Sequence, residues 1–367
     1  MNKSFSIYLD LVRFVAACLV YMYHSNQRWL VTDILPVSNY GHSSVIVFFV
    51  LSGFVIAYVA DTKENKFSVY AASRLSRIYS VALPAVFLTI VLDAVGRQLN
   101  PGPYFYPFDN FFLRAAGSLL LLNEIWFVSI TSFSNVPYWS ICYETWYYIG
   151  FAVVMFLPKR ISTVALVALI LILGPKIVLL APLWILGVVL YRWKRLQHLP
   201  EKWAWVLVVF SIAGLWVFGQ TGVTSLGTAY FKQLIGEEWH AQFTFSKFFP
   251  TDYILGALVF INFAGMRGIS GRIAPILLTI ERPIRFLAGF TLTLYLLHQP
   301  LFLFWGSVIR GDPAGYLFWA STTAMVAVSV LAVGYMTESR RHLLKRSLEA
   351  PLQRFETWVR KQYANHH

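Results

Sequence analysis

Apolar runs long enough, or nearly long enough, to cross a lipid bilayer recur along the whole of this 367-residue chain. A spanning helix needs about 20 mostly apolar residues. The chain is 57% hydrophobic and only 13% charged, which is too little polar surface for a soluble protein of this length. We therefore predict an all-α fold, a polytopic membrane helix bundle with about ten transmembrane helices. The expected spans are 7–27, 43–60, 77–97, 138–157, 161–174, 177–193, 203–219, 250–266, 286–308 and 316–336.

The distribution of basic residues predicts which side of the membrane each loop faces, because Lys and Arg concentrate in cytoplasmic loops. The apolar stretch 111–130 is ambiguous, since it carries Asn123, Glu124 and a Ser/Thr-rich exit. If this stretch crossed the membrane, every later loop would change sides and the charge bias would reverse for that half. We therefore predict that it is re-entrant or lies on the outer face, and that both termini are cytoplasmic.

The regions outside the spans also carry information. We predict a membrane domain over 1–337 and a basic cytoplasmic tail helix over 338–367 that lies on the membrane surface. The net charge of +13 fits cytoplasmic loops and contacts with membrane lipids better than binding to nucleic acid. The longest outer loop, 220–249, is a candidate lid or acceptor contact. Cys18 and Cys142 both fall in apolar runs and imply neither a disulfide framework nor a metal cluster.

Two titratable side chains, Arg13 and His24, stand eleven residues apart in the first apolar run. At about 100° per residue they return to nearly the same helical face, roughly 16 Å apart along the axis. One interpretation is a functional site that faces the protein interior. The other is an arginine that reaches the cytoplasmic headgroups and a histidine at the opposite interface. Asp10 precedes Arg13 by three positions, so the two side chains can pair.

The second and third apolar segments contribute a pair of small residues and a pair of arginines. Ser52 and Gly53 lie in the middle of the second segment, where they predict either close helix packing or a gap through which a thin ligand could pass. Arg74 and Arg77 stand one turn apart at the inner mouth of the third segment. Two guanidinium groups there suit a phosphate-rich cytosolic ligand, although ordinary anchoring at the inner interface accounts for them equally well.

Ser140 and Glu144 share one helical face, four residues apart, in the segment PYWSICYETWYY. This segment should begin near the outer surface, at the level where His24 emerges. A histidine–carboxylate pair there is the usual arrangement for a general base and its orienting group, and an interhelical hydrogen bond without chemistry is the alternative. In the ninth segment His298 is followed by Pro300, which favours a kinked helix with a satisfied core histidine.

Taken in order along the chain, these motifs resemble those of the membrane-bound acyltransferase-3 family, a large group that O-acylates bacterial glycans. Each motif alone is weak, and it is their order from residue 7 to about 336 that carries the resemblance. One departure is Ser80, where the family often has proline, with Pro84 following later. The matching residues are Leu9-Asp10 with the spacing from Arg13 to His24, Phe48-Phe49-Val50-Leu51-Ser52-Gly53-Phe54, the pair Arg74 and Arg77, Trp139-Ser140 with Glu144, and Tyr295-Leu296 with His298 and Pro300.

The resemblance implies a stand-alone membrane O-acyltransferase that moves an acetyl or similar acyl group from a cytosolic acyl-CoA, usually acetyl-CoA, to a sugar hydroxyl. The acceptor would be a cell-surface or exopolysaccharide glycan or its lipid-linked precursor, and the enzyme would lie in the bacterial inner membrane. The catalytic residues would be His24 as general base and Glu144 as the group that holds its tautomer, with Ser140 or a main-chain N–H as the oxyanion donor. Donor binding would involve Arg13, Arg74, Arg77, Ser52 and Gly53, with Asp10, Trp139, Tyr143 and His298 in support, and no metal is implied.

Two other functions fit the sequence. A transporter of polysaccharide or lipid-linked glycan would explain the intramembrane Arg and His and the broken helices, but the chain lacks the inverted repeat that many transporters show. A non-catalytic membrane assembly partner would bind no acyl-CoA. The sequence names neither the acceptor sugar, the acyl chain nor the oligomeric state, and it leaves direct transfer and an acyl-histidine intermediate both open.

Overall fold

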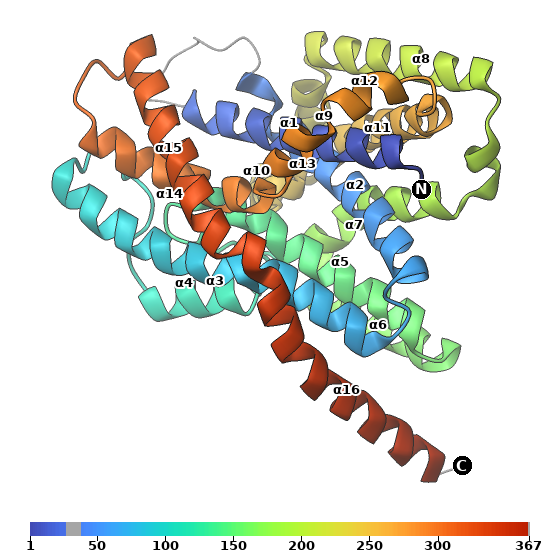
Figure 1. The fold of residues 1–367 in the computed structure, drawn as a ribbon. Coiled ribbons are helices and arrows are strands. Elements are labelled where there is room, and N and C mark those ends of the chain that lie inside the picture. The colour runs from blue at the N-terminus through green and yellow to red at the C-terminus, as the bar shows by residue number, and fades with distance from the viewer. Residues whose placement is uncertain (27–37, 366–367) are drawn as a thin grey trace.

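A computed structural model describes residues 1–26 and 38–365, and within these residues every regular element is a helix (Figure 1). The predicted all-α fold is therefore confirmed for this part of the chain. The α-helices are α1 (Lys3–Ser25), α2 (Gly41–Thr62), α3 (Phe67–Leu99), α4 (Phe111–Leu119), α5 (Trp139–Phe156), α6 (Lys159–Leu173), α7 (Pro175–Arg192), α8 (Glu201–Gln220), α9 (Val223–Ile235), α10 (Glu237–Gln242), α11 (Phe249–Ile269), α12 (Ala274–Thr279), α13 (Glu281–Ala288), α14 (Thr291–Val308), α15 (Tyr316–Met336) and α16 (Arg341–Asn365). Short 3-10 helices are η1 (Ser38–Tyr40), η2 (Val136–Tyr138), η3 (Lys194–His198), η4 (Thr244–Phe248) and η5 (Glu338–Arg340).

Each of the predicted spans coincides with a helix, namely α1, α2, α3, α5, α6, α7, α8, α11, α14 and α15. In the described chain, 7 helices are long and apolar enough to cross a membrane, or up to 8 if α13 and α14, which meet at 55°, form one bent span. The two remaining predicted spans, α5 and α6, do not meet this criterion, for different reasons. α6 has only 15 residues, and α5 carries Glu144 and several Ser, Thr and Tyr residues that lower its hydropathy. The chain is thus a multi-pass membrane protein, and the count of ten stays a prediction.

The ambiguous stretch 111–130 does not form a spanning helix. Its helix, α4, has 9 residues, which reach about 14 Å, less than half of a hydrocarbon core of about 30 Å. The irregular part that follows is held by side chains: Trp146 Nε1 donates to the carbonyl of Leu121 at 2.8 Å, and Lys176 Nζ donates to Glu124 Oε2 at 2.7 Å. Irregular backbone at membrane depth needs such cover by protein, so this geometry agrees with the predicted segment that does not cross.

The start of the chain, the predicted inner loops and the start of the tail meet at one end of the bundle, called the N-terminal end below. Lys3 at the start of α1 pairs with Glu281 of α13 at 2.6 Å. Met1, Glu64 and Lys345 line one cavity, although they come from the chain start, the α2–α3 loop and α16. This clustering is what the predicted topology requires, and the cytoplasmic placement of the N-terminal end stays a prediction.

The centre of the bundle is the contact between α2 and α7, and α2 is the most buried of the candidate spans. Two glycines permit this contact. A Cβ at Gly53 would lie 1.9 Å from the carbonyl oxygen of Trp184, and a Cβ at Gly187 would lie 2.0 Å from that of Val50. Small residues let helix backbones approach this closely within a membrane. Close helix packing is therefore the correct interpretation for Gly53.

Replacing Gly53 with alanine should destabilise the protein strongly, because the clashing atom is a backbone oxygen that cannot rotate away. We expect the free energy of unfolding to fall by about 1–3 kcal/mol or more, measured as a lower thermal midpoint of the detergent-solubilised protein. Gly117→Ala is the matched control, since nothing lies within 4 Å of a Cβ built at that helical glycine. Equal midpoints for the two variants would contradict this account of the α2–α7 contact.

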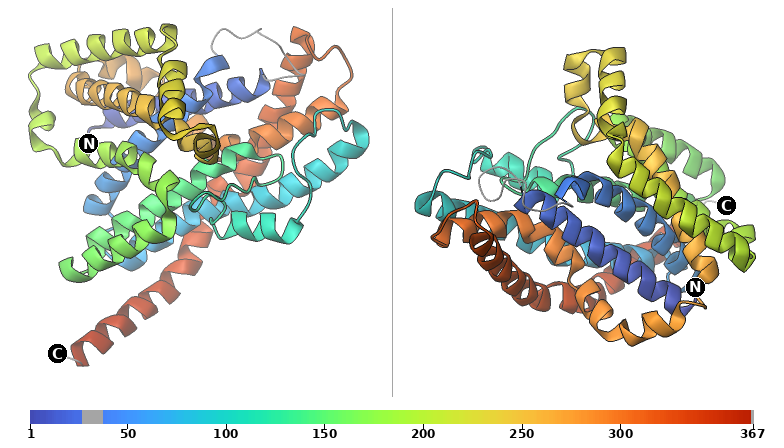
Figure 2. Two further views of the ribbon diagram at one scale, coloured as in Figure 1. Left: turned by 180° about the vertical axis from the view of Figure 1, so that it is seen from behind. Right: turned by 90° about the horizontal axis from the view of Figure 1, so that it is seen from above.

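The periphery of the bundle is apolar. α6 and α8 expose large side chains such as Val164, Leu171, Phe210 and Trp216, which fits a surface in contact with lipid. α9 and α10 project from one face of the molecule in the right-hand view of Figure 2. They belong to the predicted outer loop 220–249, which is largely helical.

The tail forms the helix that the sequence predicts. α16 follows α15 through η5, and the two lie along one diagonal in Figure 1. The tail packs against α3, where the backbone N–H of Ser68 donates to Glu356 at 3.1 Å. The tail therefore continues the direction of the last span and contacts the bundle, and its place on the cytoplasmic membrane surface stays a prediction.

Candidate functional site

A cavity of about 530 Å³, called the central cavity below, lies inside the bundle between α1, α2, α3, α5 and α14. Its volume falls within the range of about 300–1,000 Å³ that is usual for small-molecule sites. The structure brings together in its wall six of the residues singled out from the sequence. These are Asp10, Arg13, Ser52, Arg77, Ser140 and Glu144.

A second cavity of about 410 Å³, called the vestibule below, adjoins the central cavity at the N-terminal end. The residues that line both cavities are Asp10, Arg13, Val55, Arg77, Arg285 and Arg341. The vestibule adds Arg74 and Lys345, and the carboxylates in its wall are Asp10 and Glu64. Guanidinium and ammonium groups outnumber carboxylates here, so the vestibule suits an anionic, phosphate-bearing ligand.

The two predicted phosphate-binding arginines are not equivalent. α3 begins at Phe67, ten residues before the predicted start of that span, so both arginines lie within the helix rather than at its mouth. Arg74 is buried and donates to Glu64 at 2.7 Å, with its guanidinium over the ring of Tyr148 at 5.7 Å. Arg77 lines both cavities and forms no ion pair with a described residue. Of these two arginines, Arg77 is therefore the one whose guanidinium is available to a ligand phosphate.

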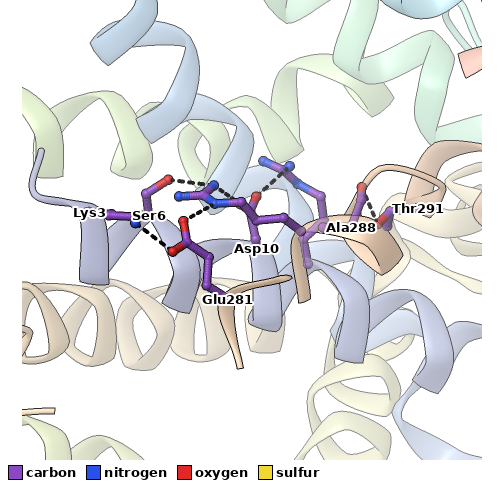
Figure 3. Close-up of polar contacts among 8 residues, drawn as sticks. Lys3, Ser6, Asp10, Glu281, Ala288 and Thr291 are labelled. Atoms are coloured by element: carbon purple, nitrogen blue, oxygen red, sulfur yellow. Dashed lines mark hydrogen bonds and ion pairs between the residues drawn. The ribbon is translucent and has the colours of Figure 1, made fainter. Parts of the chain in front are cut away.

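A carboxylate between two arginines marks the junction of the cavities. Asp10 accepts from Arg13 at 3.2 Å and from Arg285 at 2.8 Å, which confirms the predicted pairing of Asp10 with Arg13. Glu281 in turn accepts from Arg285 at 3.0 Å and pairs with Lys3. Figure 3 shows Asp10 of α1 and Glu281 of α13 on facing elements, joined by these contacts. The network ties the start of α1 to α13 beside the vestibule.

Glu144 does not pair with His24 as we predicted. It accepts a hydrogen bond from Ser52 Oγ at 2.5 Å and another from the hydroxyl of Tyr148. Among the described residues it makes no hydrogen bond to His24. Ser52 thus faces the central cavity, whereas Gly53 faces α7 and takes no part in the cavity wall. The structure therefore gives Gly53 a packing position in place of the predicted contact with the donor.

Two hydroxyl groups meet in the part of the central cavity that the vestibule does not share. Ser140 Oγ and the Tyr295 hydroxyl lie 2.6 Å apart, and both residues line the cavity. When Ser140 donates to Tyr295, the Tyr295 O–H is left to donate toward the cavity. The pair can therefore present one hydrogen-bond donor to a ligand.

His24 lies beside a second histidine. The ring centroids of His24 and His298 are 5.1 Å apart. His298 Nδ1 bonds the carbonyl of Leu294 at 3.0 Å, but its Nε2 is buried without a partner among the described residues. His298 is thus only half satisfied, in contrast to the predicted core histidine. Its ring is 6.2 Å from that of Tyr295, which lines the central cavity, whereas His24 itself is not in the cavity wall.

Two aromatic residues of the segment that carries Ser140 and Glu144 contact the predicted outer loop instead of the cavity. Trp139 stacks on Phe245, with ring centroids 4.4 Å apart and planes within 3°. The Tyr143 hydroxyl bonds Ser246 Oγ at 2.9 Å. Both contacts reach η4, so the support that these residues give the site is packing against the end of the loop 220–249.

The sequence motifs do not single out three charged residues of the cavity wall, namely Arg285, Glu338 and Arg341. Glu338 accepts from the backbone N–H of Thr293 at 2.9 Å, so η5 caps the start of α14. The arginines carry a signal in the sequence only as members of the basic inner loops and tail. The packing of the helices brings these residues together, and no local sequence pattern predicts that packing.

The arrangement defines what the site can do. Cations line the entrance, uncharged residues such as Phe48 and Leu51 line the interior, and a pair of hydroxyls stands at the inner part of the wall. Such a site can hold a ligand with a phosphorylated end and a thin uncharged arm.

Comparison with known proteins gives an independent finding about the chain. A family model described as an acyltransferase domain matches residues 6–337, nearly the whole chain. No curated protein and no solved structure matches the chain. The match favours the acyltransferase prediction over the transporter and the non-catalytic partner.

Proposed function

The chain belongs to the acyltransferase-3 family, and from this premise we propose that it is an O-acyltransferase of the bacterial inner membrane. Its donor is a cytosolic acyl-CoA that carries an acetyl or similar acyl group. Its acceptor is a sugar hydroxyl of a cell-surface or exopolysaccharide glycan, or of the lipid-linked precursor of such a glycan. The observation that carries the proposal is the pair of adjoining cavities, which together run from a cationic entrance to the hydroxyls of Ser140 and Tyr295.

The vestibule supports a coenzyme A donor. Arg77 faces it without an ion pair to a described residue, and Arg285 and Arg341 lie in the same wall. Guanidinium groups bind phosphate oxygens in pairs, which suits the phosphates of the nucleotide. The pantetheine arm is uncharged and reaches roughly 20 Å when extended, so it can follow the central cavity and carry the thioester inward.

The reaction forms an ester C–O bond and breaks the thioester C–S bond. We assign to His24 the role of general base, which takes the proton of the acceptor hydroxyl as that oxygen attacks the carbonyl. The Ser140–Tyr295 pair would donate a hydrogen bond to the oxyanion. The thiolate leaves with coenzyme A, and the proton held by His24 passes to solvent or to that thiolate. Because His24 lies outside the cavity wall, it would contact the acceptor rather than the donor.

A direct test of the reaction uses detergent-purified protein, acetyl-CoA labelled in its acetyl group, and glycans extracted from cells that lack this chain. Such glycans are unmodified at the position where the enzyme acts. The proposal expects base-labile label to move to the glycan only when the protein is present. Absence of transfer by the wild-type protein would contradict the proposed reaction.

The proposed donor site predicts that replacing Arg77 lowers the affinity for coenzyme A. Arg77→Gln should weaken coenzyme A binding by roughly 10–150-fold, because a hydrogen bond to a charged group contributes about 1.5–3 kcal/mol. Equilibrium binding of coenzyme A to purified protein measures this. Arg272→Gln is the matched control, since Arg272 is exposed and pairs with Glu201 away from both cavities. Equal affinities for the two variants would remove Arg77 from the donor site.

A further inference from the structure

A histidine–carboxylate pair that the mechanism above does not use lies between α2 and α11. His42 Nε2 is 3.0 Å from both carboxylate oxygens of Asp252. The Asp252 side chain is 2% exposed, whereas that of His42 is 23% exposed. Both residues stand in the first turns of their helices, at the end of the bundle opposite the N-terminal end. The carboxylate is therefore buried beneath an imidazole that solvent reaches.

The pairing fixes the chemistry of the imidazole. A carboxylate accepts only, so Nε2 of His42 carries the proton that it donates to Asp252. In the neutral imidazole Nδ1 is then a hydrogen-bond acceptor, and it has no hydrogen-bond partner among the described residues. A buried carboxylate that holds one ring nitrogen and leaves the other accessible is the arrangement proteins use to bind or activate an O–H group.

Aromatic rings surround this imidazole. The ring centroid of Phe248 is 4.7 Å from that of His42. Trp139 lies nearly parallel to His42, with ring centroids 6.4 Å apart and an interplanar angle of 13°, and Phe245 stacks on Trp139. Phe245 and Phe248 are only half-buried and belong to η4, at the end of the loop 220–249. One acceptor nitrogen among flat apolar surfaces fits a ligand with hydroxyl edges and C–H faces.

The pair also adjoins the central cavity. Val45, three residues after His42 on α2, lines that cavity, which places His42 about 4.5 Å further along the helix axis. Ser140, the residue after Trp139, lines the cavity as well. His42 and Asp252 therefore lie just beyond the part of the central cavity that holds the Ser140–Tyr295 hydroxyls, on the side away from the vestibule.

We propose that His42 and Asp252, with the half-buried rings of Phe245 and Phe248, form an acceptor subsite that binds a hydroxyl-rich ligand, a sugar, from the face opposite the vestibule. An acceptor hydroxyl donates to His42 Nδ1, and the rings cover an apolar face of the sugar. This inference rests on the proposed acyl transfer and adds to it where the acceptor is held. The donor enters from one end of the bundle, and the acceptor binds at the other.

The test uses His42→Gln, Asp252→Asn and the double variant as purified full-length proteins, with acetyl-CoA and the extracted unmodified glycan described above. We expect each single variant to raise the half-saturating glycan concentration by about tenfold, the effect of one lost hydrogen bond in a binding site. The affinity for coenzyme A should not change. The double variant should lose no more than either single variant, because the two residues act as one unit.

The matched control is His198→Gln, which replaces an exposed histidine of η3 that lines neither cavity. We expect the control to keep the wild-type half-saturating glycan concentration.

Three results would overturn the subsite. One is an unchanged half-saturating glycan concentration in His42→Gln. Another is a joint loss of glycan and coenzyme A affinity, which would indicate a structural contact between α2 and α11. The third is a lower maximal rate at an unchanged half-saturating concentration, which would make His42 part of the chemistry instead. Failure of the acyl transfer itself would be recognised separately, because it would already appear in the wild-type protein.

Discussion

Replacing His24 with alanine should lower the rate of acyl transfer by about 10²–10⁴-fold, the usual contribution of a positioned general base. Binding of coenzyme A should stay as in the wild type, because His24 is not in the wall of the central cavity or the vestibule. The rate is measured as label transferred from acetyl-CoA to glycan at saturating donor. The loss should therefore appear in the maximal rate and not in the donor affinity.

The control for this variant is His198→Ala, an exposed histidine of η3. It should transfer label at the wild-type rate. If His24→Ala also kept that rate, then His24 would have no part in the reaction. The half-satisfied His298 beside it, or His42, would then be the next imidazoles to consider as the base.

The second large effect concerns stability. Lys176→Met should lower the free energy of unfolding by about 3–5 kcal/mol, because it leaves the buried Glu124 carboxylate without its partner. The Lys176 and Glu124 side chains are 0% and 1% exposed, and Nζ also donates to the carbonyl of Val128 at 2.7 Å. Unfolding of the detergent-solubilised protein by heat or denaturant measures the loss.

Two further measurements distinguish the loss of the Lys176–Glu124 ion pair from an unspecific destabilisation of the protein. The double variant with Glu124→Gln should recover much of the loss, because no buried charge then remains. Burial raises the pKa of Glu124 even though Lys176 opposes the shift. Without Lys176 the pKa of Glu124 rises further. Protonation of Glu124 as the pH falls should therefore reduce the destabilisation of Lys176→Met. A destabilisation that neither Glu124→Gln nor acid reduces would contradict the ion-pair account.

Most of the helices could be predicted from the sequence, because apolar runs of spanning length are local signals. The number of membrane-spanning helices was harder to predict. α5 mixes apolar residues with Glu144, and α6 ends early at Gly174, which adopts φ 76°. The 55° bend between α13 and α14, ahead of Thr291, was not predicted, and the kink expected at Pro300 inside α14 stays a prediction. Packing between helices decides such features, and a single segment does not encode it.

Several residues of the cavity wall could be predicted from the sequence, but their geometry could not, and their roles stay predictions. Asp10, Arg13, Ser52, Ser140 and Glu144 do line one cavity, since a polar side chain in an apolar run tends to face the protein interior. Which of them touch depends on how helices rotate against each other, so the partners of Glu144 were not predictable. The pair of His42 and Asp252 was missed, although an Asp inside the apolar run 250–266 was a signal that could have revealed it.

The short ionic network around Asp10 has a consequence for how tightly a polyanion can bind. Arg285 is already neutralised by Asp10 and Glu281, so an incoming phosphate gains this guanidinium only by displacing a carboxylate that holds it. The net gain in binding free energy is then only the difference between the attraction of Arg285 for the phosphate and its attraction for the carboxylate. Dissolved salt weakens both attractions at this entrance. The entrance thereby favours capture with ready release, which suits a donor whose spent form must depart after every turnover.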